Sequence, residues 1–160
     1  MAQNGDGRRD FEFFYGAWNT RNRRLVRRLE NCTEWEEFDA VAACQPILGG
    51  IGNIDSMSAI FPDGTPFEGG SYRLFNPKTG LWSIYWADDR SCELFPPVLG
   101  RFVDGVGEFH GEDTHNGIPV KVVFHWTEIT STSAHWQQAF SADDGATWET
   151  NWHSYHTRIS

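Results

Sequence analysis

Hydrophobic and polar residues alternate along most of the chain, which is the pattern of β-strands that bury one face. The stretch Ile118–Glu128 shows it clearly, because Val120, Val122, Phe124 and Trp126 share a face. The stretches predicted as strands are Gly16–Arg28, Glu37–Gln45, Asn53–Phe61, Tyr72–Phe75, Leu81–Ala87, Val98–Val103, Val106–Asp113, Ile118–Glu128, Ala134–Ser141 and Thr147–Thr157. The pattern therefore predicts an all-β fold.

Short turn signals separate these stretches, most of them an Asn or Asp followed by Gly. They are Asn76–Gly80, Asp104-Gly105, Asn116-Gly117 and Asp144-Gly145. Such pairs accept the positive φ angles of tight hairpins, so neighbouring strands should pair antiparallel. Closing the resulting meander removes its unpaired edges. The sequence thus predicts a single domain over residues 1–160, an antiparallel up-and-down β-barrel of about 8–10 strands.

Two segments near the N-terminus interrupt this pattern. Asp10–Tyr15 is predicted as a short helical turn that its first residue caps, with Phe11 and Phe14 on one face. Such a turn, placed just before the first strand, would plug one end of the barrel. Arg21–Glu37 fits either a helix or a long strand, and we expect a strand followed by a loop around Asn31–Trp35.

Plausible hairpin registers give the last three strands one continuous aromatic face. The predicted cross-strand pairs are Trp126 with Trp136, Phe124 with Gln138, Phe140 with Trp148, and Trp136 with Trp152. One choice of register sorts all three strands consistently, whereas a slip of one residue would reverse the faces. We therefore assign this aromatic face to the barrel interior.

The inferred interior fits two interpretations, a solid aromatic core or a pocket walled by aromatic rings. Trp82, Ile84 and Trp86 form a further inward face, and Tyr72 and Leu74 do so on the strand before them. Three polar side chains in the inferred interior favour a pocket, because buried polar groups need partners: Gln138, Thr150 and Ser154. The predicted ligand-lining residues are Tyr72, Trp86, Trp126, Trp136, Gln138 and Trp152, with Arg101 as the anchor for a polar end.

Composition narrows the partners of this barrel. The chain has 160 residues, 15% of them aromatic, and a formal net charge of −9, which disfavours nucleic acid as a partner. The three cysteines, Cys32, Cys44 and Cys92, form no CxxC pair, so neither a disulfide framework nor a thiol zinc site is predicted. No apolar run approaches the about 20 residues that span a membrane, and no signal segment is visible, so a cytoplasmic protein is expected. Monomer and homodimer both remain open.

The segment Gly16-Ala17-Trp18, at the start of the first strand, resembles the Gly-x-Trp signature of the lipocalins and the wider calycin superfamily. The resemblance implies that Trp18 closes the barrel base and that a late arginine, Arg158, packs over it. Three longer segments resemble a bacterial group of lipocalin-like proteins of unknown function: Phe11–Trp18, Trp82–Asp88, and Trp136–Ser141 through Asn151-Trp152. The resemblance implies the barrel and supplies no activity. The Thr-Asp-Tyr motif of secreted lipocalins is absent.

The leading functional prediction is the binding of a small hydrophobic or aromatic molecule inside the barrel, without a cofactor. The alternative is an enzyme, a small barrel cyclase or isomerase of bacterial natural-product biosynthesis. Its candidate acid–base residues at the barrel mouth are Asp88, Arg101, His110 and Asp113. A carboxylate against apolar walls has a raised pKa and could transfer a proton on a bound substrate.

Haem binding is a second alternative. Six histidines are present, but their spacing predicts no mononuclear metal site, and His156 is the one inferred to point inward. The nitrobindins, small barrels of the same superfamily, hold haem through a late histidine, which the position of His156 resembles. The chain departs from them after Trp18, where Asn19-Thr20-Arg21 replaces a glycine-rich repeat.

Overall fold

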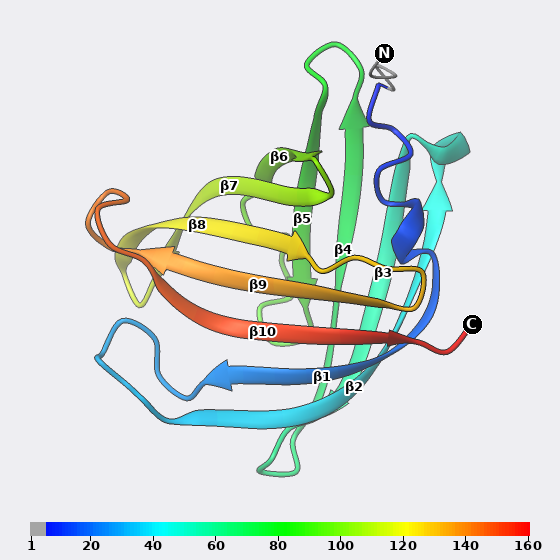
Figure 1. Cartoon of the computed structure of the whole chain (residues 1–160). Helices are drawn as coiled ribbons and strands as arrows, with labels where there is room; N and C mark the ends of the chain where they lie inside the picture. Colours follow the sequence, from blue (N-terminus) through cyan, green and yellow to red (C-terminus); the bar gives the residue numbers. More distant parts are fainter. Residues whose placement is uncertain (1–5) are drawn as a thin grey trace.

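The computed structural model describes residues 6–160, and these form one closed barrel of ten antiparallel strands (Figure 1). The strands are β1 (Gly16–Leu25), β2 (Trp35–Ile47), β3 (Gly52–Ile60), β4 (Pro66–Asn76), β5 (Leu81–Asp88), β6 (Val98–Val103), β7 (Val106–His115), β8 (Ile118–Thr127), β9 (Ser133–Ser141) and β10 (Glu149–Arg158). Two short 3-10 turns are η1 (Glu12–Phe14) and η2 (Leu48–Gly50). Each strand pairs with its neighbours in sequence, and β1 pairs with β10 to close the barrel. The predicted up-and-down barrel is confirmed.

The Asx-Gly turns act as the sequence predicts. Asp104 and Asn116 each have a φ of 50°, and the glycines that follow them have φ values of 78° and 79°. Two consecutive residues with positive φ make a tight turn whose twist matches that of the flanking strands. The hairpins β6–β7 and β7–β8 therefore turn in two residues and fix the register of this wall.

The β1–β2 connection differs from its prediction. Strand β1 ends at Leu25, three residues before the predicted Arg28, and the chain then loops until β2 begins at Trp35. Leu29 and Asn31 have φ values of 61° and 53°, a conformation that a regular strand cannot hold. The loop thus begins earlier than hydrophobicity indicates, and it carries Arg28 to the rim of the barrel.

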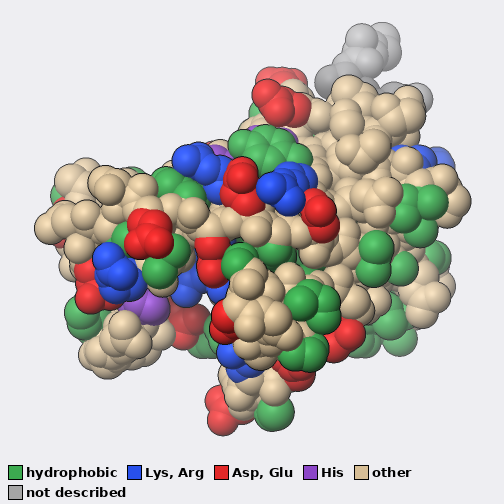
Figure 2. Space-filling model, turned by 90° about the horizontal axis from the view of Figure 1, so that it is seen from below, with side chains coloured by type: hydrophobic (Ala, Val, Ile, Leu, Met, Phe, Trp, Pro, Cys, Tyr) green, Lys and Arg blue, Asp and Glu red, His purple; other side chains and the backbone are tan. Residues whose placement is uncertain are grey.

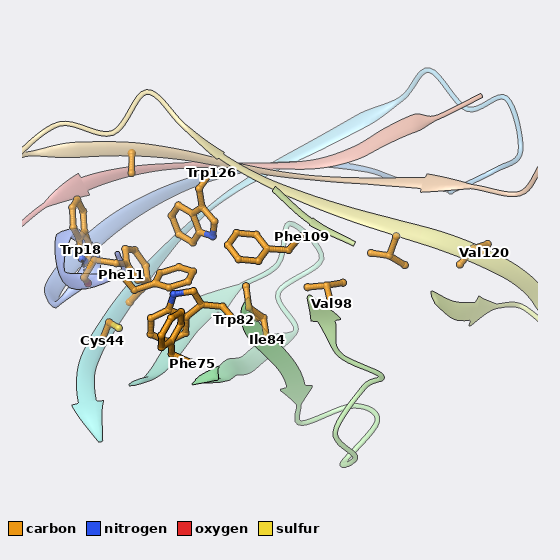
Figure 3. Packing of buried hydrophobic residues seen from close by; sticks show 14 residues of the cluster. Phe11, Trp18, Cys44, Phe75, Trp82, Ile84, Val98, Phe109, Val120 and Trp126 are labelled. Carbon is orange, nitrogen blue, oxygen red and sulfur yellow. Dashed lines mark hydrogen bonds between the residues drawn. The ribbon is translucent and has the colours of Figure 1, made fainter. Parts of the chain in front are cut away.

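The N-terminal turn closes one end of the barrel. It is shorter than predicted, and Asp10 does not cap it, because residue Phe11 occupies the cap position without any side-chain cap hydrogen bond. Phe11 and Phe14 are nevertheless buried inside the barrel as predicted. Figure 3 shows Phe11 among the rings of Trp82, Phe109 and Trp126, with ring-centroid distances to them of 5.0, 5.8 and 6.2 Å.

The closed end is sealed from outside by Arg158, which lies over Trp18 in the arrangement that the lipocalin resemblance implies. The guanidinium carbon lies 4.2 Å from the centroid of the fully buried Trp18 ring. Its nitrogens donate to the carbonyl oxygens of Ser131, Tyr15 and Phe13. Gly16 has a φ of 111°, and a Cβ there would lie 2.3 Å from the Ser160 carbonyl oxygen. This end therefore has no room for a ligand.

The predicted register is correct between β8 and β9 and wrong between β9 and β10. Trp126 lies opposite Trp136 as predicted, and Phe124 lies opposite Gln138. Across the next pair, Trp152 faces Gln138 instead of Trp136, a shift of two residues, and Trp136 faces Ser154. A bulge at Asn151 then turns Trp148 outward, where it is 40% exposed. Because the shift is even, Trp136 and Trp152 still share the inner face.

Strand β4 presents the opposite face from the one predicted. Tyr72, which was predicted to line the interior, is 38% exposed, whereas Arg73 is only 3% exposed. The alternation along β4 therefore sends Phe67, Ser71, Arg73 and Phe75 inward. An arginine can occupy this position because Asp55 on β3 neutralises it.

Two further observations bear on the partner predictions. Cys32, Cys44 and Cys92 are all free thiols, and burial raises the pKa of the Cys44 thiol to about 12. Within residues 6–160, no helix has the length and apolar character required to cross a membrane.

Candidate ligand-binding site

A cavity of about 490 Å³ lies inside the barrel, between the plugged end and the opposite rim. The rim is formed by the loops that follow β1, β3, β5, β7 and β9. The lining side chains that carry rings include Phe95 on the loop after β5 and, on the strands, Phe67, Trp86, Phe124, Trp126, Trp136, Phe140 and Trp152. Figure 2 views the molecule from the side of the β3–β4 turn and shows a hollow flanked by acidic and basic side chains. The barrel is therefore a container with one closed end.

The aromatic walls are held by ring-to-ring packing. Trp136 makes edge-to-face contacts with Phe124 and Trp152, at centroid distances of 5.0 and 6.1 Å. On the opposite side, Phe67 stacks on Trp86 at 6.3 Å. Edge-to-face and offset stacking are the favoured geometries of aromatic pairs, so these contacts stabilise the walls.

His156 lies at the inner end of the cavity as a neutral imidazole. Its ring stacks on Trp126 at 5.3 Å, and its Nδ1 lies 3.2 Å from Thr20 Oγ1. Burial, with smaller contributions from the charges of Arg73 and His135, lowers the pKa of His156 to about 3. The buried Nε2 atom has no partner among the described residues. The unprotonated nitrogen of a neutral imidazole can accept a hydrogen bond or coordinate a metal.

A buried ion pair supports the floor of the cavity. Arg73 Nη2 lies 2.5 Å from Asp55 Oδ2, and Arg73 Nη1 donates to Asn53 Oδ1 at 2.9 Å. Asp55 also accepts the backbone N–H of Ser71 at 3.0 Å. Arg73 Nε has no partner among residues 6–160. The pair therefore leaves one buried donor unpaired in the described part of the chain.

Two of the three polar residues expected inside, Gln138 and Ser154, have protein partners, whereas Thr150 does not line the cavity. Gln138 donates to Asn151 Oδ1 at 2.8 Å, while Ser154 and Trp152 donate to Asn22 Oδ1 at 2.6 and 3.1 Å. The amide nitrogens of Asn22 and Asn151 are buried without partners in the described part of the chain. Asn151 is fully buried because the β10 bulge turns it inward, which the sequence did not indicate.

The structure brings together most of the predicted ligand-lining residues. Those on the cavity wall are Trp86, Trp126, Trp136, Gln138 and Trp152. The interior placement of Tyr72 is wrong, as described for β4. The anchoring position assigned to Arg101 is also wrong, because Arg101 lies on the outer face of β6 beside Glu108 of β7. The charged residues that do line the cavity include Arg24, Arg28, Asp55 and Arg73, none of which hydrophobic patterning could select.

The four residues of the enzymatic alternative are not brought together. Asp88 and Asp113 line the cavity, whereas Arg101 and His110 lie in an outer groove, and His110 contacts Glu108 at 2.6 Å. Burial raises the pKa of Asp88, but hydrogen bonds from Ser91, Trp86 and Arg90 outweigh it and lower the pKa below its ordinary value. The lowered pKa favours the ionised carboxylate of Asp88, at the end of β5, over a proton donor.

Metal binding by a cluster of side chains has no support in the part of the chain that the structure describes. No group of three or more His, Cys, Asp or Glu side chains there is arranged to hold a metal ion. His135 and His153 contact each other at 2.9 Å on the outer face of β9 and β10, without a third such ligand.

The neutral state of His156 predicts a pH dependence of stability. The pKa of about 3 in the folded protein is below the value of 6.5 in the unfolded chain, so the unfolded state binds the proton first. The contribution of neutral His156 to the free energy of unfolding is fully present above pH 6.5. It is lost as the pH falls towards 3, at about 1.4 kcal/mol per pH unit. Urea unfolding of the wild type between pH 7 and 5 should show this slope.

His156→Gln is the matching variant, because an amide can keep the contact with Thr20 without titrating. Burial also lowers the pKa of His135 and His153, so the variant should retain a smaller slope of the same sign. A slope as steep as that of the wild type would contradict the assignment of the proton to His156.

Comparisons with known proteins identify the fold. Neither family models nor curated proteins match the sequence. An S-type phycobiliprotein lyase, CPES from Guillardia theta, superposes with a TM-score of 0.63 at 10% identity, covering 100% of this chain and 98% of that chain. A protein of unknown function from the DUF3598 family of Nostoc punctiforme gives a TM-score of 0.58 at 13% identity, covering 93% of this chain and 49% of that chain. EF1p2_mFAP2b bound to DFHBI gives a TM-score of 0.48 at 12% identity, with coverage of 95% and 98%.

At the level of its fold, this protein is a closed antiparallel barrel similar to those of the first two proteins. At identities of 10% and 13% these likenesses show the fold alone. Function has to be argued from the site itself.

Proposed function

We propose that this protein binds a small, flat aromatic or hydrophobic molecule inside the barrel. The single observation that carries the proposal is the cavity of about 490 Å³ walled by Trp86, Trp136 and Trp152 and closed at its inner end. Cavities that hold small organic ligands measure roughly 300–1,000 Å³ and are lined mainly by apolar and aromatic side chains. A molecule of two to three fused or linked rings suits these walls.

The polar groups at the inner end of the cavity would fix the orientation of the bound ligand. His156 and Arg73 line the cavity, and His156 Nε2 and Arg73 Nε are buried without partners in the described residues. A ligand with a hydroxyl, carbonyl or ring nitrogen that shifts the neighbouring side chains would hydrogen-bond these atoms. Satisfying such a group recovers the cost of leaving it unpaired in a low-dielectric interior. The apolar walls thus supply affinity, and these few nitrogens orient the ligand.

The activity of the similar lyase is not carried over to this chain. The Guillardia theta protein is named as a phycobiliprotein lyase, and at 10% identity the two chains share a barrel rather than a set of site residues. The proposal therefore rests on the cavity of this chain.

A neutral naphthalene dye tests the proposal. N-phenyl-1-naphthylamine should bind with saturable fluorescence enhancement and should quench tryptophan emission. Trp136→Leu should weaken this binding about tenfold, because it removes a flat wall and an aromatic partner. The measurement is a fluorescence titration of each purified variant.

Trp148→Leu is the matched control. It removes the same indole from a position 40% exposed and outside the cavity, so the affinity should stay unchanged. Equal effects of the two variants, or the absence of saturable binding to the wild type, would contradict a binding site inside the barrel.

Haem binding through His156 is the second candidate. The observation in its favour is the unpartnered Nε2 of a neutral, buried imidazole, since neutral histidine is the form that ligates iron. The His156 ring stacks on Trp126, so a haem bound to His156 would have to fit beside the Trp126 ring or displace it. Addition of haemin should then give a Soret band that His156→Ala abolishes, and a band that survives the substitution would exclude this ligand.

A further inference from the structure

Two arginines, Arg24 and Arg90, lie against the ring of Phe61 near the cavity mouth, and a third, Arg28, also lines the cavity. The guanidinium carbons of Arg24 and Arg90 lie 4.3 and 5.0 Å from the centroid of Phe61. Arg24 is on β1, and Arg28 is four residues further on, in the β1–β2 loop. All three arginines line the cavity. The chain has a net charge of −9, so this group is a local exception to its overall charge.

Among these cations, Arg24 has a carboxylate partner and Arg28 has none. Glu36 forms the ion pair with Arg24. Arg28 makes no ion pair with any described residue, and its buried Nε lacks a hydrogen-bond partner there. Burial, with the like charge of Arg24, lowers the pKa of Arg28 to about 10, and Glu36 and Glu149 offset only part of this effect. An unpaired, half-buried guanidinium is costly unless something else neutralises it.

Three carboxylates that line the cavity near its mouth lie on strands away from Arg28. Asp88 is on β5, and Glu112 and Asp113 are on β7, which flank β6, the strand opposite β1 in the closed ring of ten. Asp88 is already engaged by the turn that follows β5. These cavity-lining carboxylates therefore lie away from Arg28, and Glu36 and Glu149, which lie nearer to it, form no ion pair with it.

We propose that Arg28, with Arg24 beside it, binds an anionic group of the ligand, so that the ligand is an aromatic acid whose ring system lies in the cavity and whose oxyanion lies at the mouth. This inference rests on the proposed function and specifies its ligand class. The two Nη groups of Arg28 have no hydrogen-bond partner among the described residues and are not among its buried unpaired atoms, and together they form the fork from which a carboxylate or sulfonate accepts two parallel hydrogen bonds. The same contact would restore charge balance beside Arg24.

Two dyes that differ by one charge test the inference. The compound 8-anilinonaphthalene-1-sulfonate has the skeleton of N-phenyl-1-naphthylamine with an added sulfonate. Arg28→Gln should weaken binding of the sulfonate dye about tenfold, the change expected for one charge-assisted hydrogen bond, and should leave binding of the neutral dye unchanged. Arg28→Lys should recover part of the affinity, because it restores the charge without the fork.

Arg27→Gln is the control, since it removes the same charge from the adjacent, exposed residue, which does not line the cavity. The sulfonate dye should bind this variant like the wild type. Salt should weaken the binding of the sulfonate dye and not that of the neutral dye.

The outcomes separate this inference from the proposed function. Binding of both dyes with no selective effect of Arg28→Gln, or equal effects of Arg27→Gln and Arg28→Gln, would overturn the anion site and leave the cavity proposal intact. Equal weakening of both dyes by Arg28→Gln would show a structural role and would also overturn it. Failure of both dyes to bind the wild type would overturn both proposals.

Discussion

Phe11→Ala should lower the free energy of unfolding by about 3–5 kcal/mol, the range for removing a large aromatic side chain from a core. Phe11 is fully buried and makes edge-to-face contacts with Trp82 and Phe102, each at 5.0 Å. The guanidinium carbon of Arg73 also lies 4.9 Å from its ring centroid. The substitution would open a void at the centre of the plug, where rigid rings cannot close around it. Urea unfolding followed by tryptophan fluorescence measures the loss.

Phe13→Ala is the control for this prediction. Phe13 belongs to the same turn but is only partly buried, so its loss should cost clearly less. If the two variants lose the same stability, the turn contributes through its backbone and not through the Phe11 ring, and the description of the closed end is wrong.

Asp55→Ala should cost about 3–5 kcal/mol of stability, because it leaves the guanidinium of Arg73 buried without its counter-charge. The side chains of Arg73 and Asp55 are both almost fully buried, and Arg73 Nη2 lies 2.5 Å from Asp55 Oδ2. Adding Arg73→Met to Asp55→Ala removes the stranded charge, so the double variant should be more stable than Asp55→Ala alone. The measurement is a double-mutant cycle from denaturant unfolding.

A surface pair serves as the comparison for this cycle. Asp39 pairs with Arg21 at 3.1 Å, and its side chain is 81% exposed, so Asp39→Ala should leave the unfolding midpoint essentially unchanged. A double variant that loses the sum of both single losses would show that Arg73 and Asp55 act independently and do not form the pair that supports the cavity floor.

The strands and their order could be predicted because the signals for them are local. Alternation along β8 and the Asx-Gly turns at Asp104 and Asn116 depend on residues adjacent in sequence, and the barrel follows from repeating such hairpins. The aromatic face through Trp126, Trp136 and Trp152 was found for the same reason.

The polar part of the site could not be predicted because its determinants are distant in sequence. Arg73 enters the interior because Asp55 of the neighbouring strand meets it there, and alternation alone does not decide between Tyr72 and Arg73. The bulge that buries Asn151 adds one residue to β10, and the alternation of hydrophobic and polar residues does not predict this bulge. Arg28 reaches the rim because the chain leaves β1 at Leu25, which depends on positive φ angles in the loop.

A crystal structure of the protein with N-phenyl-1-naphthylamine tests the central claim most directly. The account predicts one dye molecule inside the barrel, with its rings against Trp86, Trp136 or Trp152 and its inner end towards His156. A dye bound on the outer groove beside Arg101 and His110, with the barrel interior filled by protein side chains, would contradict it.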